Sequence, residues 1–474
     1  MNETGIASAG TKMFVELLPL LFFLTICAAL MLGYPVAFTL MGVSFLCSGI
    51  GIVFGEFDSA YLSLIPNRLY GILTNQNLIA IPLFIFMGTM LEKSNIAEDL
   101  LKNMSLVFRG LPGGLGISVV VVGTLLAAST GIVGATVVTM GILSLPTMLR
   151  EGYKPSLAAG TICATGTLGQ IIPPSICLVL LGEVMSNAYQ QSQLNAGKFD
   201  GGFVSIGDLF AGALIPGIIL VFIYALYLFC VGLVKPEFAP STELDEAHAL
   251  KSTFLALIKG LFPPLFLMVV VLGSIVLGIA TPTEAASVGA MGAVFLALLK
   301  RELTFEVLKN VNLETLRVTS MVYLILIGAA IFSSVFRGFG GDIYIEELLV
   351  NLPGGASSAV LVVMLLIFLL GFILDFIEIT FMVIPVVGPV ILSMGVDPIW
   401  FGVMIAINLQ TSFLTPPFGF SLFYLRSVAP PELATVDIFK GAIPFVIFQI
   451  FLLLTLTLFP EVVTWLPRVF LRER

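Results

Sequence analysis

The chain has 474 residues, of which 58% are hydrophobic and only 11% are charged, and its mean hydropathy is +1.10. A soluble globular protein carries about 25% charged residues, so this composition excludes a soluble domain and predicts a protein that crosses the lipid bilayer. The net charge of -8 is spread over many segments, which excludes a basic face that binds nucleic acid.

Apolar windows long enough to enter or cross a bilayer follow one another along the chain. We expect helices in them, because lipid offers backbone amides no partner outside the segment and the apolar runs are continuous. The first window is preceded by neither a basic region nor a small-residue cleavage site, which predicts a retained span and not a signal peptide. The windows are Leu17–Leu32, Val36–Phe54, Leu214–Val234, Leu261–Ile279, Ala359–Leu374 and Ala442–Phe459.

Two halves of the chain carry the same pattern of helix-breaking residues. Five prolines and glycines of the first half each have an identical residue 243 positions later. A Leu-Pro-Gly-Gly tetrapeptide also occurs twice, beginning at Leu111 and at Leu352. Agreement at a fixed spacing predicts an internal structural repeat. The matched pairs are Pro146 with Pro389, Gly152 with Gly395, Pro155 with Pro398, Pro173 with Pro416, and Pro174 with Pro417.

The flanking charges predict that the two halves face opposite sides of the membrane. The first-half segment Leu115–Leu149 has five basic flanking residues, whereas its counterpart Ala356–Met394 has four acidic ones and only Arg337. Basic residues concentrate on the cytoplasmic side, so the first segment opens inward and the second outward. Inverted repeats are typical of secondary transporters that bind their substrate near the membrane midplane. The five basic residues are Lys93, Lys102, Arg109, Arg150 and Lys154.

Each of these two segments is too long for one span and too short for two, with small polar residues midway, which predicts a re-entrant hairpin. The first hairpin should turn near Ser129-Thr130-Gly131 through Thr136, and the second within Gly371–Thr380. The second turn contains Asp375 and Glu378. Ionisable residues inside apolar stretches are costly and commonly functional, although a tip exposed to an aqueous vestibule would also account for Asp375.

A double proline interrupts the segment after each hairpin, at Gly166–Ser175 and at Asn408–Pro417. Proline removes an amide donor and clashes with the preceding turn, so several carbonyl groups lose their helical partners. A hard cation such as Na⁺ could satisfy these carbonyls together with the polar hairpin tip. The half-helix that restarts at Ser175 would offer free amides to an anionic substrate group. One such kink is often only structural, but two at one register of inverted repeats favour a function.

No motif in the chain predicts catalysis or a bound cofactor. The HExxH, GxSxG and Walker patterns are absent, and the one histidine, His248, lies in a charged loop. The five cysteines lie in apolar segments without CxxC spacing, which predicts packing roles and not metal or disulfide roles. Without an ATP site, concentrative transport must draw on an ion gradient.

Several motifs together resemble those of the large membrane subunit of the tripartite ATP-independent periplasmic (TRAP) transporters, over nearly the whole chain. Any one of them alone would be weak, and the specificity comes from the set. The motifs are Gly33-Tyr34-Pro35-Val36-Ala37, Ile81-Pro82-Leu83-Phe84, Leu111-Pro112-Gly113-Gly114, Gly152-Tyr153, Ile171-Ile172-Pro173-Pro174-Ser175, Thr281-Pro282-Thr283-Glu284-Ala285-Ala286 and Thr415-Pro416-Pro417.

This resemblance implies an all-α polytopic, inverted-repeat secondary transporter of the elevator type. It also implies sodium-coupled uptake of a carboxylate or related organic acid across the bacterial inner membrane. The implied partners are a periplasmic solute-binding protein and a small four-helix membrane subunit, with Na⁺ as the coupling ion and no other cofactor. Scaffold spans are expected at 1–92, 187–335 and 427–474, and transport-domain segments at 93–186 and 336–426. The nearest alternative is a one-component sodium/carboxylate symporter of similar design that needs no binding protein.

The resemblance further implies two sodium sites and a substrate site, built from the hairpin tips and the helix breaks. The first sodium site would use Ser129, Thr130, Gly131, Thr136, Gly166, Gly169, Ile172 and Pro174. The second would use Gly371, Asp375, Thr411, Thr415 and Pro417. The substrate would contact Ser175, Thr136 and Asn408.

Overall fold

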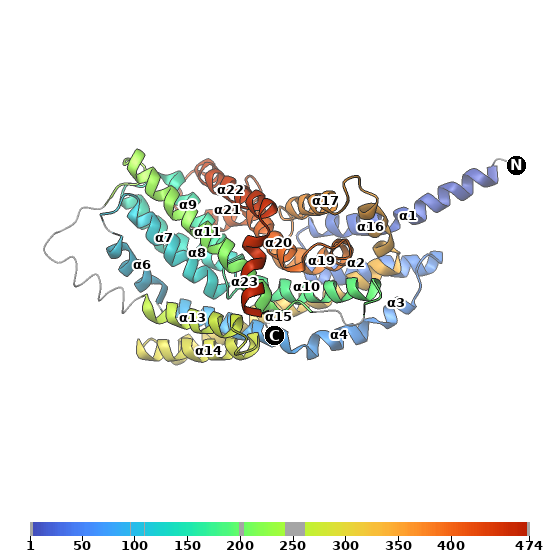
Figure 1. Cartoon of the computed structure of the whole chain (residues 1–474), viewed down its shortest axis with the longest axis horizontal. Helices are drawn as coiled ribbons and strands as arrows, with labels where there is room; N and C mark the ends of the chain where they lie inside the picture. Colours follow the sequence, from blue (N-terminus) through green and yellow to red (C-terminus); the bar gives the residue numbers. More distant parts are fainter. Residues whose placement is uncertain (1–2, 95, 109, 199–202, 242–260, 472–474) are drawn as a thin grey trace. The chain divides into compact units, whose positions relative to one another are not determined.

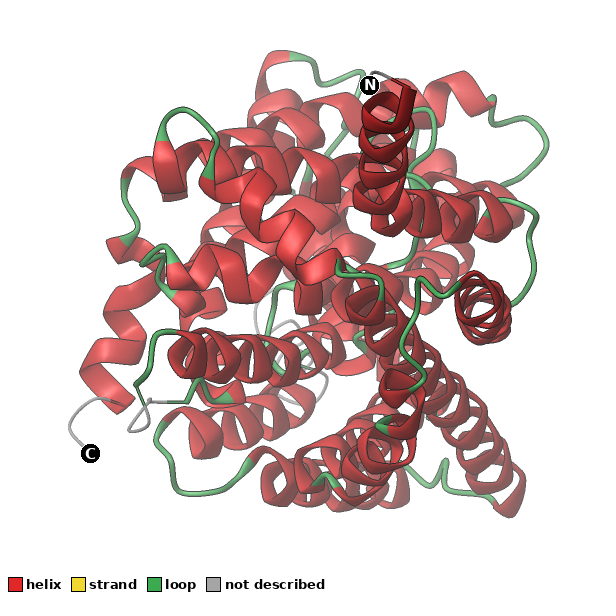
Figure 2. Cartoon of the chain, turned by 90° about the vertical axis from the view of Figure 1, so that its right-hand side faces the viewer, coloured by secondary structure: helices red, strands yellow, loops and turns green. Residues whose placement is uncertain are grey.

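The computed structural model describes residues 3–94, 96–108, 110–198, 203–241 and 261–471. All regular secondary structure in these ranges is helical, and Figure 2 shows helices joined by loops. The prediction of an all-α polytopic membrane protein is confirmed. Two residues used in the sequence analysis, Arg109 and His248, lie outside the described ranges.

Three of the predicted windows, Val36–Phe54, Leu214–Val234 and Ala442–Phe459, fall on long apolar helices, and the other three fall on shorter ones. Within the described ranges, six helices are long and apolar enough to cross a membrane, and two further bent pairs would qualify as single spans. The bent pairs are Ala60–Thr74 with Gln76–Lys93, at 49°, and Phe376–Met382 with Ile384–Ser393, at 57°. The six are α2 (Val36–Phe54), α8 (Val133–Arg150), α11 (Ile206–Val234), α14 (Pro282–Leu299), α15 (Phe305–Gly338) and α22 (Thr435–Leu458).

One compact unit comprises Met1–Gln76, Val184–Phe203 and Thr319–Pro398. An aromatic cluster forms part of its core: the ring of Phe22 stacks on that of Phe332 at 5.6 Å, and Phe57 lies 5.0 Å from Phe339. Besides α2 and parts of α10 (Ile176–Asn195) and α15, its helices are α1 (Glu3–Leu30), α3 (Ala60–Ser63), α4 (Ile65–Thr74), α16 (Gly341–Val350), α17 (Gly355–Leu370), α18 (Phe376–Met382) and α19 (Ile384–Ser393).

The second compact unit comprises Asn77–Glu183, Val204–Val318 and Ile399–Arg474. It holds the first hairpin, the first double proline and the second double proline. Besides α8, α11, α14 and α22, its helices are α5 (Ala80–Lys93), α6 (Ile96–Val107), α7 (Gly114–Thr130), α9 (Pro155–Thr167), η2 (Leu168–Gln170), α13 (Phe262–Val276), α20 (Pro398–Leu414), α21 (Phe420–Val428) and α23 (Glu461–Leu471). Figure 1 labels all of these except α5 and η2.

The predicted repeat reappears in the helix bounds. Helix α8 runs Val133–Arg150, and α18 with α19 run from Phe376 to Ser393, so both ends lie 243 positions apart. Helices α9 and α20 begin at prolines with the same separation, since proline is favoured at the first helical position. The first hairpin turns between α7 and α8, and the second between α17 and α18. Both predicted turns are confirmed.

Helices α9 and α22 cross at two glycines. A Cβ atom at Gly160 would lie 2.0 Å from the carbonyl oxygen of Gly441, and one at Gly441 would lie 1.9 Å from that of Ser156. Membrane helices associate by close packing because lipid supplies no hydrophobic drive between them, and small residues permit that approach. Only glycine fits at this crossing.

The crossing gives a stability prediction. Gly160→Ala should destabilise the protein by about 1 to 3 kcal/mol, because the methyl group overlaps the backbone of α22, and the apparent melting temperature in detergent should fall. Gly49→Ala in α2 is the matched control, since nothing lies within 4 Å of its Cβ position. Equal melting temperatures for the two variants would contradict the crossing.

The repeat gives a topology prediction. Arg150 and Ser393 end the second arms of the two hairpins, and both are exposed. In a Cys230→Ala background, Arg150→Cys should be protected from an impermeant thiol reagent added outside intact cells, whereas Ser393→Cys should be labelled. Cell lysis should make Arg150→Cys reactive. Labelling of both cysteines from outside would show that the halves are not inverted.

Candidate functional site

The tip of the first hairpin is a short turn rich in hydroxyl groups. Helix α7 ends at Thr130, Gly131 adopts the left-handed conformation (φ 63°), and α8 begins at Val133. The hydroxyl groups of Thr130 and Thr136 lie 2.7 Å apart and join the two arms. Ser129 Oγ donates to the carbonyl of Leu126 at 2.8 Å. The structure therefore brings the predicted tip residues together.

The first helix break lies directly after α9. A short 3-10 turn (η2) ends at Gln170, and α10 begins at Ile176. The hydroxyl of Ser175 donates to the Gly169 carbonyl at 2.6 Å, so one of the carbonyls predicted to seek a cation already has a partner within the chain. The Pro173–Pro174 peptide bond is cis. All residues from Gly166 to Ser175 are buried except the half-buried Ile172, as irregular backbone at membrane depth requires.

The tip and the break touch each other through backbone atoms. A Cβ atom at Gly169 would lie 2.6 Å from the Ala127 carbonyl oxygen, in the last turn of α7. One at Gly131 would lie 2.8 Å from the amide nitrogen of Ile176, where α10 begins. A Cβ atom at Gly166 would lie 2.2 Å from the side chain of Val137 on α8, at Cγ2. The residues predicted for the first sodium site therefore share one buried region.

Two glutamines that the sequence analysis missed lie in this region or next to it. Gln170 ends the 3-10 turn, and Gln410 of α20 donates from Nε2 to the Thr167 hydroxyl at 3.4 Å. Both side chains are fully buried. Within the part of the chain that the structure describes, neither amide atom of Gln170 has a hydrogen-bond partner, nor does Oε1 of Gln410. A buried amide without a partner costs about 1 to 3 kcal/mol, so these oxygens mark a place where a ligand would be stabilised.

The neutral oxygens of this region suit a monovalent hard cation. The hydroxyls of Thr130 and Thr136 and the amide oxygen of Gln170 are ligand types that Na⁺ accepts, together with the backbone carbonyls of the break. Neither Ser129–Thr136 nor Gly166–Ser175 contains Asp, Glu, His or Lys. In the described part of the chain, no cluster of acidic, histidine and cysteine side chains could hold another metal.

The two halves of the predicted second sodium site belong to different compact units. The turn holding Gly371 and Asp375 belongs to the first unit, and Thr411, Thr415 and Pro417 to the second. Asp375 caps α18: its carboxylate accepts from the Phe376 amide at 2.8 Å, and the Glu378 carboxylate accepts from the Asp375 amide at 3.1 Å. Both carboxylates therefore have a local structural role.

The second break begins later than the start of its motif, Asn408–Pro417, indicates. Helix α20 continues to Leu414, so Asn408 and Thr411 lie on a buried, regular helix, and the break covers Thr415 to Gly419. The Thr415 hydroxyl donates to the Thr411 carbonyl at 2.7 Å. The Ser421 hydroxyl donates to the Phe413 carbonyl at 2.8 Å, as Ser175 does at the first break. The Pro416–Pro417 bond is also cis.

Comparison with known proteins identifies the family. Residues 23–462 match the family described as "Tripartite ATP-independent periplasmic transporter, DctM component". The chain belongs to this family. It is 29% identical to the C4-dicarboxylate TRAP transporter large permease protein DctM of Vibrio cholerae, over 94% of this chain and 97% of that protein. It is 26% identical to the ectoine/5-hydroxyectoine TRAP transporter large permease protein UehC of Ruegeria pomeroyi, over 94% of this chain and 97% of that protein.

A solved structure supports the fold of this DctM-type chain. The YdaH transporter of Alcanivorax borkumensis superposes with a TM-score of 0.60 at 13% identity, covering 94% of this chain and 98% of that one. The resemblance drawn from the motifs is therefore confirmed, and the chain is a multi-pass membrane transport component and not an enzyme.

The unpartnered amide gives a prediction for this DctM-type chain. Gln170→Met keeps the side-chain length but removes the oxygen, so the Na⁺ concentration for half-maximal thermal stabilisation should rise about tenfold, as loss of about 1.4 kcal/mol of ligand binding requires. Stability without Na⁺ should not fall, because no hydrogen bond of the side chain is lost. Melting of the purified chain in NaCl, with choline chloride as the ionic-strength control, measures both effects.

A matched variant separates ion binding from packing. Gln449→Met removes another fully buried glutamine, on α22, whose Nε2 donates to the hydroxyl of Tyr224 on α11 at 2.9 Å and whose Oε1 also has no partner among the described residues. It should lower stability and leave the Na⁺ dependence unchanged. Wild-type Na⁺ dependence in Gln170→Met would exclude the amide as a ligand.

Proposed function

We propose that this chain is the large membrane subunit of a transporter that imports a carboxylate or related organic acid across the bacterial inner membrane together with Na⁺. In this proposal a periplasmic solute-binding protein delivers the substrate, and a small four-helix membrane subunit completes the transporter. Family membership supports the tripartite organisation, because the family is named as one component of a tripartite periplasmic transporter. The names of the relatives support a small organic solute.

The observation that carries the sodium proposal is the chemistry of the first site. Coupling to protons requires a group that gains and loses a proton, and the tip and the break of the first repeat contain none. They offer hydroxyls, backbone carbonyls and the unpartnered amide oxygen of Gln170 instead. Neutral oxygen ligands favour a hard cation whose charge does not depend on pH.

The same contacts suggest how ion and substrate binding are coupled. The tip residue Gly131 packs on the first residues of α10, where helix amides point out of the helix N-terminus. A cation held at the tip and the positive end of α10 would together favour a carboxylate nearby. Ser175 would orient this end, since its hydroxyl bonds the Gly169 carbonyl and lies 3.5 Å from the amide of Leu178. The elevator movement of the hairpin-containing domain stays a prediction.

Reconstitution tests the proposal. Liposomes holding this chain and its small subunit should accumulate organic acid only with an inward Na⁺ gradient and ligand-loaded binding protein outside. Thr130→Val should raise the Na⁺ concentration for half-maximal uptake about tenfold, because one ligand hydroxyl is lost without a change of shape. Ser105→Ala, on the exposed face of α6, is the control and should transport normally.

Two outcomes would overturn parts of the proposal. Equal uptake on a proton gradient in the absence of Na⁺ would disprove the sodium coupling. Rapid uptake by the purified chain alone would favour a one-component symporter.

A further inference from the structure

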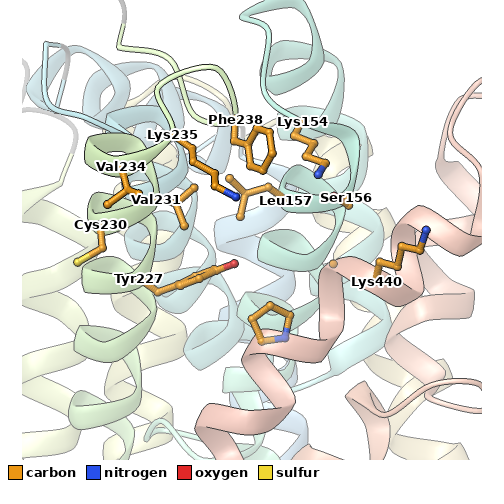
Figure 3. A pocket seen from close by; sticks show the side chains of 12 residues that line it. Lys154, Ser156, Leu157, Tyr227, Cys230, Val231, Val234, Lys235, Phe238 and Lys440 are labelled. Atoms are coloured by element: carbon orange, nitrogen blue, oxygen red, sulfur yellow. The ribbon is translucent and has the colours of Figure 1, made fainter.

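A basic pocket lies in the second unit, away from the hairpin tip. It has a volume of about 380 Å³ and is bounded by the start of α9, the end of α11 with the following loop, and the start of α22. Three lysines, Lys154, Lys235 and Lys440, line it together with the aromatic rings of Tyr227 and Phe238 (Figure 3). The proposed transport of organic acid uses none of these residues.

Backbone hydrogen bonds and contacts with an aromatic ring hold two of the pocket lysines in place. The Lys154 amide donates to the Phe238 carbonyl at 3.0 Å, and the Phe238 amide donates to the Lys235 carbonyl at 2.9 Å. The ring of Phe238 holds both ammonium groups, with Lys154 Nζ 4.0 Å and Lys235 Nζ 5.0 Å from its centroid. Figure 3 shows these two side chains converging from opposite sides of the ring.

The charges in the pocket are unbalanced. None of the three lysines forms an ion pair within the described residues, whereas Lys93, Lys102 and Lys300 each do. Among the described residues no carboxylate lines the pocket, although Glu237 and Asp437 are near in sequence. Clustered ammonium groups repel one another, so an anion between them would be stabilised. Ser156 at the first turn of α9 adds a hydroxyl and the positive helix end, a combination suited to phosphate.

The surfaces beside the pocket are apolar and exposed. Cys230 lines the pocket, and Leu226 and Phe222 continue its row along α11 at four-residue spacing, with exposures of 46% and 65%. On α22, Ile443 and Ile447 continue the row of Lys440 and are 49% and 57% exposed. Both helices are long and apolar enough to span the membrane. An anion seated in the pocket therefore has apolar strips running from it into the membrane.

We propose that this pocket binds the phosphate group of an anionic membrane phospholipid, whose acyl chains lie along α11 and α22. The flanking charges predict that this end of α9 faces the cytoplasm, where the leaflet is rich in anionic lipid. A basic pocket beside spanning helices on this side is suited to such a headgroup. The bound lipid would contact α9, α11 and α22 together and stabilise their packing at the membrane surface.

The test uses the full chain, purified in detergent and depleted of lipid. Phosphatidylglycerol should raise its melting temperature more than phosphatidylcholine does, and native mass spectrometry should retain phosphatidylglycerol on the chain. The combined variant Lys154→Gln, Lys235→Gln and Lys440→Gln should bind phosphatidylglycerol at least about tenfold more weakly, because all three ammonium groups that attract the phosphate are removed.

Two controls keep the result interpretable. Lys93→Gln, Lys102→Gln and Lys309→Gln remove the same charge outside the pocket and should leave binding unchanged. Replacement of the three pocket lysines by arginine should retain binding, which separates charge from misfolding. Equal loss in both glutamine variants would overturn the proposal. So would the full effect with sn-glycerol 3-phosphate or inorganic phosphate alone at the same concentration, since it would identify a site for a soluble anion.

Discussion

Every backbone polar group inside a membrane needs a partner, and the two double prolines are where this chain departs from helical pairing. At each break a serine that follows the prolines donates its hydroxyl back to a carbonyl before them: Ser175 to Gly169 and Ser421 to Phe413. These two hydroxyl groups therefore supply partners for some of the carbonyl groups that the breaks leave without a helical hydrogen bond. Among the described residues, the Gln170 amide and Oε1 of Gln410 lie at or next to the first break without a hydrogen-bond partner, so a ligand would be stabilised there.

The parts of the fold that sequence could predict are those set by local chemistry. Pro155 and Pro398 begin helices because proline lacks an amide and fixes φ, so their spacing of 243 reappears in the structure without any knowledge of packing. Asp375 and Glu378 have the spacing of a capping box, so their structural role could also be predicted from local sequence. Gln170 and Gln410 could not be predicted in this way, because a missing partner is visible only when the surroundings of the amide are known.

The two repeats share their helix bounds but differ in the polar residues of their hairpin turns. The first tip holds only hydroxyls, with Thr130 bonded to Thr136 across the turn, whereas the corresponding second turn places two carboxylates at the start of α18. Those carboxylates are partly engaged by backbone amides, so a cation near the second turn would compete with the helix cap. Ion binding at the second site would therefore depend more strongly on the conformation of its own turn than ion binding at the first.

Close backbone contacts surround the tip of the first hairpin and restrict the movements by which a bound ion could be released. A Cβ atom added at Gly88 of α5 would lie 2.2 Å from the Ser129 carbonyl oxygen. Cβ atoms added at Gly169 and Gly131 would also lie within 3 Å of backbone atoms around the tip. At these three contacts backbone packs on backbone, so the tip cannot move away from its neighbours by a change of side-chain rotamer alone. Opening at the tip alone would separate the α7 turn from both the break and α5, and would expose their polar groups at membrane depth. A movement that carries α5, the tip, the break and the start of α10 together would preserve these contacts, so the packing is consistent with the predicted displacement of the whole site.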